Sequence, residues 1–450
     1  MGGGGSKFRS TRVIIIGGGY GGVALAMALR DKCQLTMIDP KDHFFHNIGA
    51  LRACVEPGFT KNIFIPYAPC LGKAFLQGRA KSIDLKGKKV KLDGGQSLAY
   101  DYLVLATGSS GPFPGKLSRV LPVTELELAT EMYSLTLEKI KSAENIVIMG
   151  GGAVGVELAG EIATDFPSKN ITLIHPHKGL IDGKRFGDKF RKEVKGQLDK
   201  LKVNVLLGER VVNMEELPKD GFGKCKVKTD ARKALDADLV FDCTGLKTNS
   251  NVYTDQLDDK MDSQDRLRVN NFLQVEGQTD VYAIGDCCNA DADLNMAHNA
   301  GLHANLVAMN IQLGVSGKNY KSYKPGGPQM ILSIGRDHGV TQNGNRVLGM
   351  NKLKSHELFV DKYWKLMKQV PPAKKQGGAP KRAKTIAGRP EAQQPKNISR
   401  SKSMPPSSGN PNGQGKQTTP SAGGGAKGTK AAPPSNKKQP ASAGQKGKKK

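Results

Sequence analysis

The chain has 450 residues, of which 38% are hydrophobic, and a formal net charge of +27. This length predicts two or three domains. The chain has seven cysteines, an odd number, and no signal peptide ahead of them. This argues against a secreted protein stabilised by disulfides and favours a reducing compartment. The longest uncharged apolar run, residues 13–29, holds a glycine cluster, which indicates a strand, a turn and a helix better than a membrane span.

The first ten residues carry a candidate lipid anchor. The letters MGGGGS at residues 1–6 fit the N-myristoylation pattern, in which Gly2 becomes the acylated amine. GGGGS is also the commonest engineered linker, so that alternative stays open. Basic residues near anionic lipid would add to the weak hold of one acyl chain. Three such residues follow: Lys7, Arg9 and Arg12. We therefore predict an acylated segment over residues 1–10.

The first glycine-rich turn reads Gly17-x-Gly19-x-x-Gly22, between a β-branched run, RVIII, and a helical pattern. Asp39 ends the next apolar run, QLTMID. This is the dinucleotide fingerprint in its expected context, because the glycines let backbone N–H groups approach a pyrophosphate at the helix N-terminus and an acid can hold the ribose hydroxyls. The predicted contacts are Gly17, Gly18, Gly19, Tyr20, Gly21, Gly22 and Asp39.

The pattern recurs 133 residues further on, where Gly150-x-Gly152-x-x-Gly155 follows the strand pattern NIVIM. Two such turns predict two nucleotide-binding domains rather than glycine turns in an ordinary α/β protein. In place of the acid this repeat has three basic residues, His175, His177 and Lys178. An acid there would repel a 2′-phosphate, so we expect this loop to admit NADPH as well as NADH, unless it is only a basic surface loop.

The residues from Ala373 to the end form a basic tail, with 18 Lys and Arg against a single acid, Glu391. Large apolar side chains are almost absent, so the segment cannot bury enough surface to offset its chain entropy, and we expect residues 373–450 to be disordered. Such a charge run is most often a solvated tail. Membrane contact and weak, sequence-independent nucleic-acid binding stay open as alternatives.

Several connecting segments are more specific than the two turns, namely HNIGALRACVEPGF (46–59), LVLATGSSGPFPG (103–115), VYAIGDC (281–287), AGLHANLVAMNI (300–311) and LFVDKYWKLMKQVPP (358–372). On these segments the chain, over roughly residues 11–372, resembles the ferroptosis-suppressor group of apoptosis-inducing-factor-like flavoproteins. The tail beyond residue 372 has no counterpart in that family pattern.

The resemblance implies an α/β fold with two Rossmann-like dinucleotide-binding domains of the glutathione-reductase type. An FAD-binding domain would comprise residues 11–130 and 271–320, and an NAD(P)-binding domain would occupy residues 140–270. Residues 321–372 would form a C-terminal element on the quinone and membrane side. The implied cofactors are FAD and NADH or NADPH.

The resemblance also implies roles for single residues. Asp286 would accept a hydrogen bond from the flavin ribityl chain. Glu157, on the first turn of the helix that follows the second glycine turn, would reach toward nicotinamide and flavin and is the catalytic candidate. Glu161 lies one turn later on the same face of that helix. Both glutamates could instead complement the helix dipole. The other predicted cofactor contacts are Arg52, Ala80, Thr107, Gly108, Gly150, Gly152 and Gly155. No metal site is expected, because the histidines lack ligand spacing.

Disulfide reductases of this fold carry two cysteines beside the flavin, and here the only close pair is Cys287–Cys288, adjacent in sequence. Electrons are therefore expected to pass from flavin to a diffusible acceptor. The resemblance implies a membrane-attached, FAD-dependent NAD(P)H:quinone oxidoreductase whose quinols trap radicals and protect against lipid peroxidation and ferroptosis.

The alternatives are a respiratory type II NADH dehydrogenase and a nucleic-acid-binding pro-death flavoprotein that uses the basic tail. The expected location is the cytoplasmic face of the plasma membrane, lipid droplets or the mitochondrial outer membrane. The oligomeric state stays open.

Overall fold

The computed structural model describes residues 7–117, 124–181, 186–291, 295–327, 329–349 and 358–372. Gly2 and the other residues of the predicted acylated segment up to residue 6, like the basic tail predicted to be disordered, lie outside the described residues. All described residues belong to one compact unit. Among them, no helix is both long and apolar enough to cross a membrane.

The first half of the chain begins a five-stranded parallel sheet, with strand order β17-β9-β1-β2-β5. Every residue of β1 from Val13 to Ile16 is buried. A continuous buried run of this kind is typical of a parallel strand covered on both faces. The strands are β1 Arg12–Ile16, β2 Gln34–Asp39, β5 Phe75–Gln77, β9 Tyr102–Leu105 and β17 Val281–Ala283, and helix α2, Tyr20–Leu29, follows β1.

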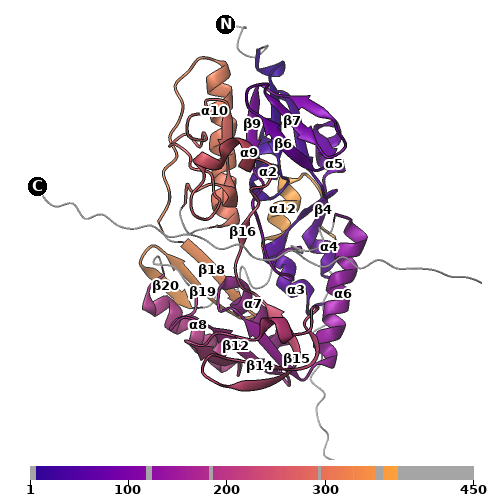
Figure 1. Cartoon of the computed structure of the whole chain (residues 1–450), viewed down its shortest axis with the longest axis vertical. Helices are drawn as coiled ribbons and strands as arrows, with labels where there is room; N and C mark the ends of the chain where they lie inside the picture. Colours follow the sequence, from indigo (N-terminus) through magenta and orange to yellow (C-terminus); the bar gives the residue numbers. More distant parts are fainter. Residues whose placement is uncertain are drawn as a thin grey trace, which may run out of the picture. The chain divides into compact units, whose positions relative to one another are not determined.

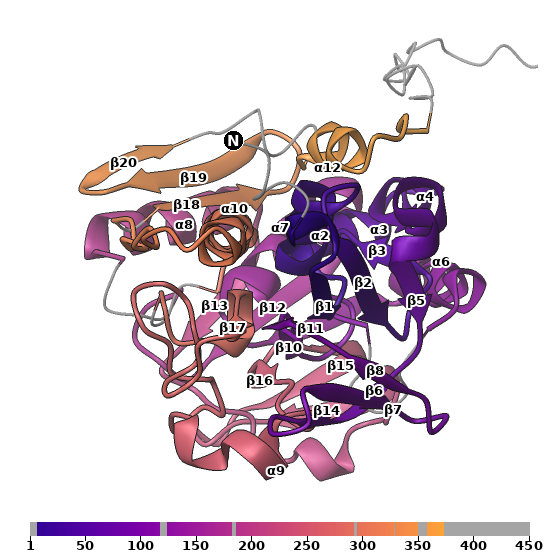
Figure 2. The same cartoon turned by 90° about the horizontal axis from the view of Figure 1, so that it is seen from above.

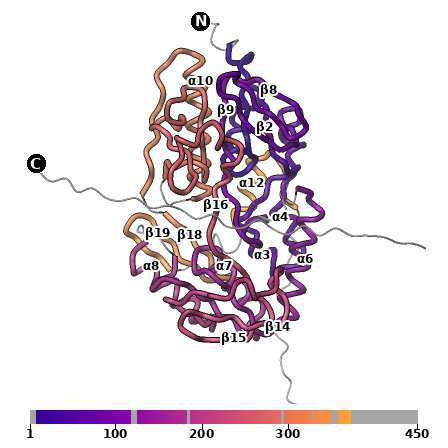
Figure 3. The backbone as a smooth tube through the Cα atoms, in the orientation of Figure 1, coloured from indigo at the N-terminus to yellow at the C-terminus, as the bar shows by residue number. Residues whose placement is uncertain are grey.

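The first sheet is completed by a late segment of the chain. Strand β17 pairs in parallel with β9, and helix α10, Ala297–Val315, packs along α2. In Figure 1 the orange helix α10 accordingly lies beside the indigo strands of the first sheet, and Figure 3 follows the chain away from these strands and back to them. The residues between β9 and β17 build the second sheet and its connections.

The second sheet has strand order β13-β12-β11-β15-β14, with β14 antiparallel and the other neighbours parallel. Its strands are β11 Asn145–Met149, β12 Asn170–His175, β13 Asn204–Leu207, β14 Phe222–Lys228 and β15 Ala234–Asp242, and helix α7, Ala153–Asp165, follows β11. Two mostly parallel sheets with helices packed on them confirm the predicted α/β class.

Smaller elements connect and cover the two sheets. Strands β6 Ala80–Asp84, β7 Lys89–Leu92 and β8 Ser97–Ala99 form an antiparallel sheet, β10 Ser109–Ser110 pairs with β16 Lys247–Thr248, and β3 His43–Phe45 pairs with β4 Phe64–Pro66. The remaining helices here are α3 Ala50–Ala53, α4 Thr60–Ile63, α5 Ala68–Leu71, α6 Leu126–Ser142, α8 Asp188–Lys200 and α9 Thr254–Leu257.

The C-terminal part contributes an antiparallel sheet and a short helix. Its elements are β18 Gln329–Ile334, β19 His338–Asn343, β20 Arg346–Gly349 and α12 Val360–Leu366. Strand β18 packs on α7 and β19 packs on α8. Figure 2 shows the three orange strands of this sheet with α8 next to them. The ring of Tyr363 in α12 lies 4.9 Å from the ring of Tyr20 at the start of α2. The domain limits given by the sequence stay predictions.

Candidate dinucleotide sites

The first glycine turn is built so tightly that two of its positions exclude any side chain. Gly17 has φ +107°, and a Cβ there would lie 2.3 Å from the carbonyl oxygen of Ala106 in the neighbouring strand loop. A Cβ on Gly22 would lie 1.8 Å from the oxygen of Gly17. These contacts explain the first and last glycines of the motif, since a side chain at Gly17 would collide with the strand loop at Ala106 and one at Gly22 would collide with the turn itself.

Asp39 holds the turn from the end of β2. Its Oδ2 accepts the Gly18 N–H at 2.6 Å, and its Oδ1 accepts both the backbone N–H and the Nζ of Lys41 at 2.8 and 2.7 Å. The carboxylate is 3% exposed. The ribose contact expected of Asp39 stays a prediction. Sequence reasoning missed Tyr67, whose hydroxyl donates to the Gly18 carbonyl at 2.7 Å, because no motif marks it.

The second turn repeats this geometry. Gly150 has φ +106°, and a Cβ on Gly155 would lie 1.9 Å from the oxygen of Gly150. The N–H of Gly151 donates to Nδ1 of the buried His175 at 3.0 Å, which is the counterpart of the Gly18–Asp39 bond. Since Nδ1 accepts, the ring is neutral and carries its proton on Nε2. The two turns therefore differ in charge at the same structural position.

The middle glycine of each motif faces open space. Gly19 and Gly152 are the N-cap residues of α2 and α7, and a Cβ on either would meet no atom of the described residues within 4 Å, its own chain neighbours aside. Both positions have extended backbone that any residue adopts, so steric demand within the protein does not explain a glycine there. A ligand phosphate that approaches the helix N-terminus does explain it, and the residues present therefore fit a dinucleotide at each turn.

The loops after β9 and β17 meet at the carboxyl end of the first sheet. Asp286, after β17, accepts the Ser109 hydroxyl at 2.6 Å, and Lys116 Nζ lies 3.8 Å away. Thr107 and Gly108 precede Ser109, and Gly108 has φ +66°. Ligands of open α/β sheets bind outside the carboxyl ends of the strands, where these predicted residues gather.

Three other residues that were predicted to contact a cofactor, Tyr20, Gly21 and Ala80, have the following protein contacts. The hydroxyl of Tyr20, the first residue of α2, is 3.0 Å from Nδ1 of His46. Gly21 packs toward Ile284, the residue after β17. Ala80 opens strand β6, where it pairs with Leu92 in the small antiparallel sheet. The structure thus brings Tyr20 and Gly21 to the first turn and places Ala80 in a separate sheet.

Glu157 is held by the C-terminal sheet. It is buried on the first turns of α7, and its Oε1 accepts the backbone N–H and the hydroxyl of Ser333 in β18, at 3.0 and 3.1 Å. Sequence reasoning missed Ser333, which lies 176 residues away in the chain. The C-terminal element therefore fixes the orientation of the catalytic candidate.

Arg52 and Glu161 form a buried ion pair between the two halves of the unit. Arg52 in α3 donates to both carboxylate oxygens of Glu161 in α7, at 3.1 and 2.8 Å, and each side chain is 2% exposed. Burial raises the pKa of Glu161, and Arg52 opposes the rise. Next to this pair, Arg336 contacts Asp165 of α7 and Glu56. In the structure Arg52 is thus bound to Glu161, and its contact with FAD stays a prediction.

All seven cysteines are free in this structure. Cys287 and Cys288 are both buried, and burial raises the pKa of each thiol. A thiol that is buried and protonated is a poor nucleophile.

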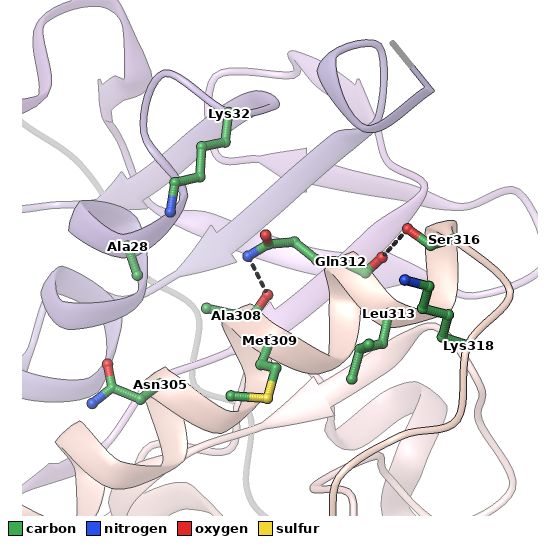
Figure 4. Close-up of a pocket in the computed structure, with 9 residues that line it drawn as sticks. All are labelled: Ala28, Lys32, Asn305, Ala308, Met309, Gln312, Leu313, Ser316 and Lys318. Carbon is green, nitrogen blue, oxygen red and sulfur yellow. Dashed lines mark hydrogen bonds between the residues drawn. The ribbon is translucent and has the colours of Figure 1, made fainter. Parts of the chain in front are cut away.

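A groove of about 440 Å³ between α2 and α10 lies away from both turns (Figure 4). It opens near Ala28, at the end of α2 opposite Gly19, so it is not the dinucleotide site. Its lining mixes apolar and polar side chains, namely Ala28, Lys32, Asn305, Ala308, Met309, Gln312, Leu313, Ser316 and Lys318.

Two sheets that each open with a dinucleotide turn define a flavoprotein reductase with two dinucleotide-binding domains. The sequence profile described as pyridine nucleotide-disulphide oxidoreductase matches residues 11–304, and the chain belongs to this family. It is therefore an NAD(P)H-dependent flavin oxidoreductase. Membership of the family implies FAD and NAD(P)H as cofactors.

Relatives and solved structures agree with this assignment. Ferroptosis suppressor protein 1 of Homo sapiens is 43% identical over 365 residues, which cover 80% of this chain and 96% of the relative, so the predicted resemblance is confirmed. The sulfide:quinone oxidoreductase of Aquifex aeolicus has a TM-score of 0.63 at 19% identity and covers 81% of this chain and 93% of its own. NDH2 of Plasmodium falciparum has a TM-score of 0.58 at 17% identity, with 80% and 94% covered. At these identities the two structures show the fold alone.

Proposed function

We propose that the protein is a membrane-attached, FAD-dependent NAD(P)H:quinone oxidoreductase whose quinols trap radicals and protect lipids from peroxidation and ferroptosis. The observation that carries this proposal is the pair of glycine turns, each with an open middle position, in a chain whose only close cysteine pair, Cys287–Cys288, is adjacent in sequence and buried. The overall reaction would convert NAD(P)H, a proton and a quinone into NAD(P)⁺ and a quinol. The name of the human relative supports the role against ferroptosis.

The residues of this chain would supply binding and orientation. Backbone N–H groups at the two turns would hold the pyrophosphates at the N-termini of α2 and α7. Asp286 would orient one cofactor from the end of β17, and Glu157, fixed by Ser333, would face the nicotinamide. Bound FAD would supply the two-electron carrier between nicotinamide and quinone. Catalysis of this kind depends mainly on positioning.

The first prediction tests the enzyme and its tether together. The purified protein should be yellow and should oxidise NADPH with a short-chain ubiquinone in solution. With a long-chain ubiquinone confined to liposomes, acylated wild type should react at least about tenfold faster than Gly2→Ala, because one myristoyl chain contributes on the order of 10⁴ M⁻¹ of membrane affinity. NADPH oxidation followed by absorbance measures both rates.

The two quinones separate the two claims. A protein without flavin, or one that reduces neither quinone, contradicts the oxidoreductase proposal. Equal rates of wild type and Gly2→Ala on liposomes contradict the tether and leave the enzyme standing. The short-chain quinone is the matched control, since both proteins should reduce it equally.

The second prediction concerns the choice between NADPH and NADH. His175 takes the structural place of Asp39 but is neutral, so we infer that the second site admits a 2′-phosphate. In His175→Asp a carboxylate would accept the Gly151 N–H and repel that phosphate. The ratio of kcat/KM for NADPH to that for NADH should fall at least about tenfold, since 1.4 kcal/mol of repulsion suffices.

His175→Asn is the matched control, because its amide oxygen accepts the same N–H without charge. It should keep the wild-type ratio. If the two variants change the ratio equally, the selectivity comes from geometry and the charge argument is wrong.

A further inference from the structure

A buried histidine stands behind the turn that carries Asp286. His303 in α10 is 1% exposed, and its Nδ1 accepts the backbone N–H of Gly285 at 3.1 Å. Gly285 opens the turn with φ +72° and directly precedes Asp286. The sulfur of Cys288, at the end of the same turn, lies 4.0 Å from Nδ1. His303 is therefore the side-chain anchor of this turn.

The other side of the imidazole faces a carboxylate. Nε2 lies 2.9 Å from Oδ2 of Asp291, without the geometry of a hydrogen bond. Asp291 Oδ1 in turn accepts the hydroxyl of Tyr323 at 2.7 Å, and the ring of Tyr323 stands edge-on to the imidazole at 4.5 Å. Tyr323 is fixed through its backbone N–H, which donates to Asn271. A polar chain thus runs from Tyr323 through Asp291 and His303 to Gly285.

These contacts assign one protonation state. Nδ1 can accept the Gly285 N–H only when it is unprotonated, so the ring is neutral and its proton sits on Nε2, toward Asp291. A second proton would occupy Nδ1 and remove the only acceptor that the ring offers to Gly285. Asp291 would stabilise the resulting imidazolium.

We propose that His303 is a positioning residue for the flavin: neutral and held by Asp291, it fixes the Gly285 N–H and thereby aims Asp286, and its protonation releases the turn. The inference rests on the proposed flavin site. Nothing in the local sequence marks this role, since His303 has no motif spacing to Asp286.

The groups that face His303 are few. The turn contributes Cys288 and also carries Asp286 and Cys287, the loop before α10 contributes Asp291, and the segment after α10 contributes Tyr323. Helix α2, which packs along α10, carries Tyr20 as its one titratable side chain. Among the described residues, Asp291 is thus the anion in contact with the ring.

The test measures FAD affinity in the full-length protein by the change in flavin fluorescence, from about pH 5 to about pH 8, where histidine titrates. Wild type should bind FAD more weakly as the pH falls. His303→Gln keeps an acceptor for Gly285 but cannot titrate, so it should bind FAD like wild type at neutral pH and lose the pH dependence. His303→Leu should weaken FAD binding at least about tenfold at neutral pH, because the buried N–H of Gly285 loses its partner.

Asp291→Asn is the second arm, because it removes the charge that favours imidazolium and keeps an acceptor for Tyr323. Its midpoint for FAD loss should move to lower pH. His338→Gln, a half-buried histidine of β19 remote from the turn, is the control and should follow the wild-type curve.

The outcomes distinguish failure of the role inferred for His303 from failure of the proposed function. If wild type and His303→Gln lose FAD along the same pH curve, the inference is wrong. If wild type binds no FAD at any pH, the proposed function fails instead. If circular dichroism shows that His303→Leu does not fold, the pH curves of His303→Gln and Asp291→Asn still decide, and an unshifted midpoint in Asp291→Asn contradicts the role of the carboxylate.

Discussion

Replacement of Gly152 by alanine is expected to weaken NADPH binding at least about tenfold and to change the free energy of unfolding by less than about 1 kcal/mol. In the part of the chain that the structure describes, no atom beyond the chain neighbours lies within 4 Å of the added Cβ, and the backbone there is extended, so the folded protein accepts the methyl group. The methyl group would instead occupy the space that a phosphate needs. The KM for NADPH and urea unfolding measure the two quantities.

Gly187→Ala is the matched control. Gly187 is also the N-cap of a helix in the second sheet region, has nearly the same backbone angles, and faces open space. Any general cost of alanine at an N-cap therefore appears in both variants. If Gly152→Ala leaves the KM for NADPH at the value of Gly187→Ala, the second turn does not bind the nucleotide.

Arg52→Met is expected to lower the free energy of unfolding by about 3–5 kcal/mol, because it leaves the Glu161 carboxylate buried without its cation. Both side chains are 2% exposed, so water cannot replace the lost partner. The same variant should open the interface between α3 and α7. Chemical denaturation followed by circular dichroism measures the loss.

Two comparisons sharpen this prediction. Arg52→Met combined with Glu161→Met should recover much of the loss, since buried ion pairs can be replaced by apolar side chains at little cost. Arg12→Met removes the partner of Asp101 in a pair that is 46% and 40% exposed, and should lower the free energy of unfolding far less than Arg52→Met does, because water screens exposed pairs. Equal losses in Arg12→Met and Arg52→Met would contradict the role given to burial.

The glycine turns could be predicted because their cause is local. Gly22 excludes a side chain through its contact with Gly17 inside one strand–turn–helix, and Asp39 closes the same unit from the next strand. Gly17 has a positive φ in the same turn, although the oxygen that its Cβ would meet belongs to Ala106, in the loop after β9. A pattern of about 25 residues therefore contains most of the geometric reason. The fold class and the family followed from two such patterns and from the segments between them.

The rest depends on contacts between distant parts of the chain. Ser333 on Glu157 and Arg336 on Asp165 join residues more than 170 positions apart, and neither has a spacing that points to its partner. The resemblance assigned Arg52 to FAD, and only the folded arrangement reveals Glu161 beside it. The equivalence of His175 and Asp39 likewise needed the two hydrogen bonds to the turns.

Because the chain returns to the first sheet only at β17, the second sheet can form before the first is complete during synthesis on the ribosome. Strand β9 ends at Leu105 and its partner β17 begins at Val281. The first sheet therefore stays incomplete while about 175 residues are made, which takes roughly 10 to 35 s at about 5–20 residues per second. The second sheet ends at Asp242 and can fold during that wait. The first half of the nascent chain meanwhile leaves the backbone edge of β9 unpaired, so we expect chaperones to bind this half during translation.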